Sequence, residues 1–130
     1  MIFYRDLSDI PLADLESRKF PCEATAWGLA RATKHKDFDA FLSLYADRVR
    51  AVDDASRLAL MRASNPRYVL RNWMAQRAIE AADKDNDFSE VKKLLRVLKR
   101  PFQVQGEAEA AGYASPPPNW SKSIKVSCSS

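Results

Sequence analysis

The sequence predicts an all-α fold, an irregular bundle of about five to six helices followed by an extended C-terminal arm. Apolar residues recur at steps of three and four between residues 37 and 100, the spacing of one buried face of a helix. No segment alternates strictly between apolar and polar residues, as a half-buried strand does. With only 3 glycines among 130 residues, a turn-dense sandwich or barrel is disfavoured. We therefore expect an irregular segment over residues 1–36, a helical core over 37–102 and an arm over 103–130.

Length and composition limit the chain to one soluble domain. The sequence is 46% hydrophobic and 29% charged, which excludes a wholly disordered chain. Its apolar runs are far shorter than the roughly 20 residues of a membrane span, and no signal-length run follows Met1. Two cysteines are too few for a disulfide framework, so we expect a reducing compartment. That compartment is the cytoplasm if the chain is bacterial, with mitochondria as an alternative if it is eukaryotic.

Residues 1–36 show the least regular pattern. Pro11 and Pro21 interrupt the apolar positions, which predicts short helical pieces joined by turns. A second apolar cluster, between Ala24 and Ala32, predicts another short helix. His35 is flanked by two lysines, so we expect an exposed side chain and no metal or catalytic role.

A regular helix is predicted from Asp37, its expected N-cap. The apolar face of this helix consists of Phe38, Phe41, Leu42, Tyr45, Val49 and Val52. Asp53-Asp54 is expected to open the next helix. That helix should direct Leu58 and Met61 inward, together with Ala55 and Ala59.

The clearest predicted boundary is Ser64-Asn65-Pro66, where Asn65 would cap a helix and Pro66 would occupy its first position. The helix is expected to run to about Asp83 and to lie centrally. Its apolar positions are Val69, Trp73, Ala75, Ala78, Ile79 and Ala82. Arg71 on this helix needs a fixed carboxylate or carbonyl partner, which could lie outside this chain. Asn72 and Gln76 need hydrogen-bond partners if they are buried.

The last predicted helix begins at Asp87-Phe88-Ser89-Glu90, a variant of the capping box. Its expected inner face consists of Val91, Leu94, Leu95 and Leu98, and Pro101 ends it. The periodicity then disappears. Residues 103–130 therefore read as an extended arm with a polyproline stretch at 116–118.

No catalytic, cofactor-binding or metal-binding constellation is recognisable in the sequence. It lacks a glycine-rich phosphate loop, a nucleophile elbow and a zinc-binding motif, and its single histidine cannot complete a Cys2His2 site. Residues 62–100 carry ten basic against five acidic residues. A solvated helix face explains this surplus. Nucleic-acid binding would need exposed aromatic side chains on which bases stack, and Tyr68 and Trp73 are better explained as core residues.

Three stretches resemble the C-terminal region of the selenoprotein O family, the pseudokinase-like protein adenylyltransferases. The first is M-R-A-S-N-P-R-Y-V-L-R-N-W-M-A-Q-R-A-I, from Met61 to Ile79. The second begins at Asp87 as D-F-S-E-V and ends in R-P-F at Phe102. The third is P-P-N-W at 117–120 followed by V-S-C-S-S at 126–130. The ordered set at these spacings carries the resemblance.

The resemblance implies a kinase-like fold that transfers AMP from ATP to Ser, Thr or Tyr of target proteins, using Mg²⁺. The family's nucleotide and metal residues lie upstream of the matched stretches, so it assigns no catalytic, cofactor or metal residue here. It implies the missing kinase-like core as a partner, in cis or in trans, and protein substrates for the full-length enzyme. The short apolar runs exclude a membrane partner, and the mild basic bias disfavours nucleic acid. The matching signature residues are Asn65, Pro66, Arg71, Asn72 and Gln76, and Cys128 matches the family's redox position.

Two other interpretations remain open at this point: a small helical binding module for a protein or nucleic acid, and an inactive gene remnant. We also predict that Cys128 is free or intermolecular, since nothing specifies its docking against Cys22. Cys128 should then react with a maleimide faster than Cys22 does.

Overall fold

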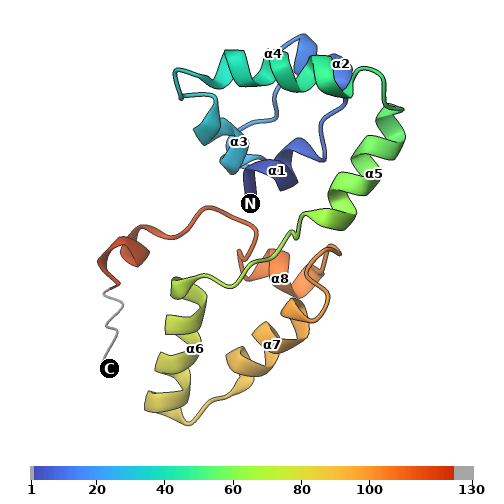
Figure 1. Cartoon of the computed structure of the whole chain (residues 1–130). Coiled ribbons are helices and arrows are strands. Elements are labelled where there is room, and N and C mark those ends of the chain that lie inside the picture. Colours follow the sequence, from blue (N-terminus) through green and yellow to red (C-terminus); the bar gives the residue numbers. More distant parts are fainter. Residues whose placement is uncertain (1, 125–130) are drawn as a thin grey trace, which may run out of the picture. The chain divides into compact units, whose positions relative to one another are not determined.

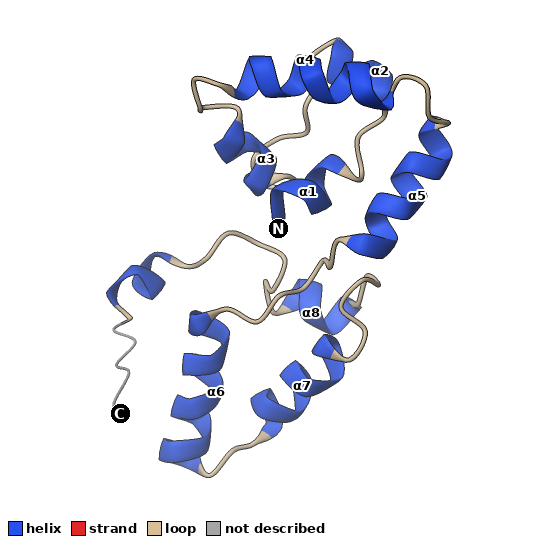
Figure 2. Ribbon diagram, in the orientation of Figure 1, coloured by secondary structure: helices blue, strands red, loops and turns tan. Residues whose placement is uncertain are grey.

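The computed structural model describes residues 2–124, and it is helical throughout its regular structure (Figures 1 and 2). Within these residues it contains eight α-helices, one 3₁₀-helix and no strand. This confirms the all-α prediction, with more and shorter helices than the sequence pattern indicates. The chain divides into two compact units, Met1–Arg67 and Tyr68–Ser130. Their boundary falls inside the predicted 37–102 segment.

The first unit contains five helices: α1 (Ile2–Leu7), α2 (Leu12–Glu16), α3 (Trp27–Ala32), α4 (Phe38–Val49) and α5 (Asp54–Ser64). The first three are the short pieces expected over residues 1–36. The buried core of this unit consists of Leu7, Ile10, Leu15, Ala26, Leu29, Phe38 and Leu42.

Helices α1 and α3 approach most closely at Gly28. A Cβ atom at this position would lie 2.8 Å from both Ile2 Cγ2 and the Phe3 backbone nitrogen. Because the backbone nitrogen cannot move aside as a side chain can, the packing of α1 on α3 requires glycine here.

The two acidic helix starts differ in how they are capped. Asp53 is the N-cap of α5, and its carboxylate accepts a bond from the Ser56 backbone N–H at 2.8 Å. Asp37 occupies the N-cap position of α4 but makes no side-chain capping bond there. Its backbone N–H instead donates to His35 Nδ1 at 3.3 Å. The predicted start is therefore right, and the predicted capping role of the Asp37 side chain is wrong.

The inner face of α5 also differs from the prediction. Ala55 and Ala59 are exposed, and Arg57 is the buried residue of this helix. Met61 packs against the core cluster as expected. The inner face of α5 therefore contains the guanidinium of Arg57, which has polar partners in the interior, and not the two predicted alanines.

The predicted helix start at Asn65-Pro66 is wrong. Asn65 ends α5 in an extended conformation, and its side-chain Nδ2 donates to the Met61 carbonyl at 2.9 Å. Helix α6 begins only at Asn72 (Asn72–Asp85). The reason lies in the packing of Tyr68: its ring is buried and its backbone N–H donates to the Pro101 carbonyl at 3.1 Å. This long-range bond holds the chain extended where local sequence favours a helix.

In the second unit, α6 and α7 (Ser89–Leu98) form a helical hairpin, followed by α8 (Gly106–Ala110) and η1 (Asn119–Ser123) (Figure 1). Asn86 ends α6 in the left-handed conformation, with φ of 50°. The buried core consists of Tyr68, Trp73, Met74, Ala78, Leu94, Val97, Ala108 and Tyr113. Tyr68 and Trp73 are thus core residues, as predicted.

Several apolar residues of α6 and α7 are not in this core. Ile79 is 60% exposed, Leu95 57% and Val91 42%, although the helical spacing predicts them to be buried. The apolar face of the hairpin is therefore wider than the part that α8 and the following chain cover.

Asp87 lies one residue before Phe88, the N-cap of α7, and its carboxylate accepts from the Ser89 backbone N–H at 2.8 Å. Glu90 does not complete the predicted capping box. Its side chain is buried and accepts a hydrogen bond from Tyr113 at 2.6 Å. A tertiary partner outcompetes the local one because the tyrosine hydroxyl itself is buried and must find an acceptor.

The segment after Pro101 is packed more closely than the predicted arm. Ala108 in α8 and Tyr113 are fully buried, and Gly112 makes the turn between them with φ of +74°. A helix of five residues is too short to produce a repeating apolar pattern, which is why the sequence shows none here.

Candidate functional site

Arg71 is the signature residue with the most defined contacts. It lies at the N-cap position of α6, and its guanidinium donates to the Ser115 carbonyl at 2.8 Å and the Tyr113 carbonyl at 3.2 Å. Burial lowers the pKa of this guanidinium. The partners that the sequence required are carbonyls of this same chain. Arg71 thus fastens the segment after α8 to the start of α6.

The other signature residues take ordinary structural positions. Asn65 ends α5, and Pro66 follows it in the extended segment. Asn72 is exposed at the start of α6. Gln76 donates from Nε2 to the Glu80 carboxylate at 2.9 Å on the surface. Asn65 and Pro66 belong to the first unit and the other three to the second, so these residues form no common site within either unit.

The two cysteines cannot be compared directly. Cys128 lies outside the described residues. Cys22 is a free, exposed thiol whose sulfur lies 3.3 Å from the Thr25 hydroxyl oxygen. This hydrogen bond lowers the pKa of the Cys22 thiol.

A buried polar cluster around Glu90 escaped the sequence analysis. Tyr113, fully buried, donates to Glu90 Oε1, and Lys93 donates to Oε2 at 2.7 Å. Burial alone would raise the pKa of Glu90, but the bonds from Lys93 and Tyr113 outweigh it and leave this pKa below its ordinary value. The same burial and the bond to Glu90 raise the pKa of Tyr113. These bonds therefore favour the ionised form of Glu90, although its side chain on α7 is buried.

Arg57 forms the corresponding cluster of the first unit. Its guanidinium donates to Asp54 Oδ1 at 2.7 Å, to the Tyr45 hydroxyl at 2.9 Å and to the Ile10 carbonyl at 2.7 Å. Asp54 also accepts from the Leu12 backbone N–H at 3.0 Å. The cluster joins α5 to α4 and to the turn before α2. Charged residues three apart, at 54 and 57, were the only local signal for it.

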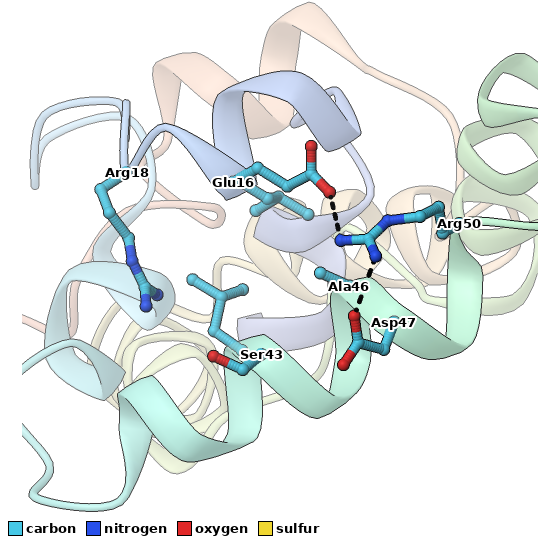
Figure 3. A pocket seen from close by; sticks show the side chains of 8 residues that line it. Glu16, Arg18, Ser43, Ala46, Asp47 and Arg50 are labelled. Carbon is cyan, nitrogen blue, oxygen red and sulfur yellow. Dashed lines mark hydrogen bonds and ion pairs between the residues drawn. The ribbon is translucent and has the colours of Figure 1, made fainter.

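A pocket of about 420 Å³ lies between α2 and α4 in the first unit (Figure 3). Arg50 bridges Glu16 at 2.9 Å and Asp47 at 3.2 Å, and Figure 3 shows Arg18 on the far side of the pocket. Arg18 pairs with Asp39 at 3.2 Å. The cations of this pocket are thus neutralised by carboxylates of the chain, and the one hydroxyl, on Ser43, has no base bonded to it: it donates to the Asp39 carbonyl. The pocket holds no catalytic arrangement.

An apolar groove of about 550 Å³ lies on the α6–α7 hairpin in the second unit. Ala78 and Leu94 are its buried residues, and its more exposed lining includes Leu70, Ile79 and Phe88. Asp83 is the single ionisable residue that lines it. This groove has the character of a contact surface and not of a reaction site.

Residues 2–124 contain no group of three or more His, Cys, Asp or Glu side chains placed to hold a metal ion. Among the helices in this range, none has the length and apolar character needed to cross a membrane.

Comparison with known proteins identifies close relatives. No protein-family model matches the chain. The protein nucleotidyltransferase YdiU of Burkholderia ambifaria is 53% identical over 95 residues, which is 72% of this chain and 18% of that protein. The protein of the same name from Thioalkalivibrio sulfidiphilus is 54% identical over 95 residues, 72% of this chain and 19% of the relative. The chain therefore spans about a fifth of the length of these curated relatives.

The helical fold and this match make the chain similar to a C-terminal part of full-length proteins that are named protein nucleotidyltransferases. Over 72% of its length the chain is similar to members of the selenoprotein O family that carry the name YdiU. The resemblance drawn from residues 61–130 is thereby confirmed.

Proposed function

We propose that this chain serves as the C-terminal helical segment of an enzyme that transfers AMP from ATP to Ser, Thr or Tyr hydroxyls of target proteins. The observation that supports the proposal is the identity of 53% over 95 residues to a protein nucleotidyltransferase. In this proposal the chain works only together with a kinase-like core, joined to it in cis or bound in trans. That core binds ATP and Mg²⁺ and contacts the protein substrates.

The residues of the chain support a structural role within such an enzyme. Nucleotidyl transfer needs metal-held phosphates and cations aimed at them. The buried Arg57 is bonded to Asp54, Tyr45 and Ile10. The buried Arg5 donates to the Arg62 and Asn65 carbonyls, and the half-buried Arg71 donates to two backbone carbonyls. Each of these cations is thus engaged in hydrogen bonds inside its own unit, as expected of a structural role.

The pairing of surface cations also disfavours the nucleic-acid alternative. Arg62 pairs with Asp9 at 2.7 Å, and Arg96 pairs with Glu107 at 2.9 Å. Lys93 is bonded to Glu90. Because each of these three positive charges is offset by a carboxylate, these side chains offer little to a phosphate backbone.

The compartment and the redox role are parts of the same proposal. A free thiol at Cys22 fits a reducing compartment such as the bacterial cytoplasm. Cys128, at the family's redox position, is proposed to pair with a thiol of the kinase-like core.

A chimera tests the proposed function. The segment of the Burkholderia ambifaria protein that matches this chain is replaced by the 95 matching residues, and transfer of labelled AMP from ATP to protein is measured with Mg²⁺ and with EDTA. We expect EDTA-sensitive transfer by the chimera and none by the isolated chain or by the relative lacking the segment. An inactive chimera beside an active relative would contradict the proposal, and transfer by the isolated chain would show an active site of its own.

A further inference from the structure

The apolar groove of the second unit carries an inference beyond the proposed function. Its side chains come from α6, from α7 and from the chain on either side of this hairpin. Its lining includes Leu70, Ile79, Ala82, Phe88, Val91 and Leu98. Of these, Leu70 is 52% exposed, Ile79 60% and Phe88 49%.

The core of the unit is complete without these exposed side chains. Ala78 and Leu94 complete that core and are 4% and 7% exposed, so the residues around them form an apolar surface above a finished interior. Large exposed apolar patches bordered by polar residues are rare in proteins that work alone and mark contact surfaces. The groove therefore has the features of a surface that contacts another apolar surface.

We propose that the groove is covered by an apolar surface of the remaining, upstream part of a YdiU-type nucleotidyltransferase, with a basic side chain facing Asp83. This inference rests on the proposed function. The matched relatives extend far beyond the segment they share with this chain, which is 18% of one of them and 19% of another. A segment that belongs within so much larger a protein has an interface to it, and the groove has the composition of one.

Charge favours this occupant over a second copy of the chain. In a symmetric dimer the same patch of both copies meets, so two Asp83 carboxylates would enter one apolar interface. Like charges that lose water in this way repel each other without compensation. A different surface can instead provide a cation for Asp83.

Binding in trans tests the proposal. The Burkholderia ambifaria protein without its matching segment is titrated with the whole chain, and affinity is measured by calorimetry. We expect Ile79→Glu and Val91→Glu each to weaken binding by about tenfold or more, because a charge would replace an apolar anchor. Leu95→Glu is the matched control: Leu95 lies on α7, is 57% exposed and does not line the groove. Circular dichroism checks that all three variants fold.

Each outcome decides the inference separately from the proposed function. Equal affinity of the Ile79, Val91 and Leu95 variants, or no binding by the unaltered chain, would overturn the groove as the docking surface. So would dimerisation of the chain that Ile79→Glu abolishes, seen by sedimentation without binding to the relative. If docking depends on the groove while the chimera transfers no AMP, the inference stands and the proposed function fails. If the chimera is active while Ile79→Glu binds normally, the reverse holds.

Discussion

Removing one hydroxyl from the second unit should reveal how strongly the Glu90 cluster stabilises it. In Tyr113→Phe the ring stays in place, but Glu90 loses the donor that lies 2.6 Å from its Oε1. Tyr113 is fully buried and Glu90 is 8% exposed, so water cannot readily replace the lost bond. A hydrogen bond to a charged group contributes about 1.5–3 kcal/mol. Because Lys93 still donates to Oε2, we expect the free energy of unfolding to decrease by an amount within this range and by no more.

The same substitution should change how stability depends on pH. In the folded chain the pKa of Glu90 lies below its ordinary value of 4.5, so the unfolded chain binds a proton more readily. The stabilisation from ionised Glu90 is therefore fully present above pH 4.5 and is lost as the pH falls through the folded pKa. Without the tyrosine hydroxyl this pKa is lowered less. The difference in stability between the parent chain and Tyr113→Phe should thus be largest at neutral pH and should shrink in acid.

Urea unfolding measures both effects. Trp73 lies 6.0 Å from the Tyr113 ring, centroid to centroid, so its fluorescence reports on this unit. Because Trp27 of the first unit also fluoresces, the measurement is made in a Trp27→Phe background, and circular dichroism follows the helices of the whole chain. The matched control is Tyr4→Phe, in which the altered residue is 48% exposed and belongs to the first unit. A loss below about 0.5 kcal/mol for Tyr113→Phe, or a loss that is the same at neutral and acid pH, would refute the reasoning.

Three further substitutions test the packing of the two units, each by chemical denaturation. Gly28→Ala should destabilise the chain by about 1–3 kcal/mol through overpacking. The control Gly106→Ala, with nothing within 4 Å of its added Cβ, should be neutral or slightly stabilising. Equal effects of the two substitutions would contradict the close approach of α1 and α3. Arg57→Met should cost about 2–4 kcal/mol, because it leaves the Ile10 carbonyl and Asp54 without their partner; a neutral result would mean that water replaces the guanidinium. Arg71→Ala should cost about 1.5–3 kcal/mol in the isolated chain, because its carbonyl partners belong to this chain, and no loss would place its important partner elsewhere.

Local chemistry was enough to predict the fold class and several helix ends. The helix starts near Asp37, Asp53 and Asp87 are visible in the sequence because an acidic residue before an apolar repeat is a short-range signal. Asp53 caps α5 as expected, whereas Asp87 binds the Ser89 backbone N–H from the position before the N-cap of α7. The family, too, could be recognised from the sequence, since its motifs are runs of consecutive residues.

Other features were decided by bonds between residues far apart in the chain. The stretch 65–71 has a good local helix signal, but the bond from Tyr68 to Pro101 and the burial of its ring keep it extended. Glu90 leaves its expected capping position because Tyr113, 23 residues later, is buried beside it. Helical spacing shows that a face is apolar, but it cannot show how much of that face the rest of the chain covers. The exposed groove of the α6–α7 hairpin therefore emerges only from the tertiary structure, because burial depends on which surfaces meet and not on the pattern of either one.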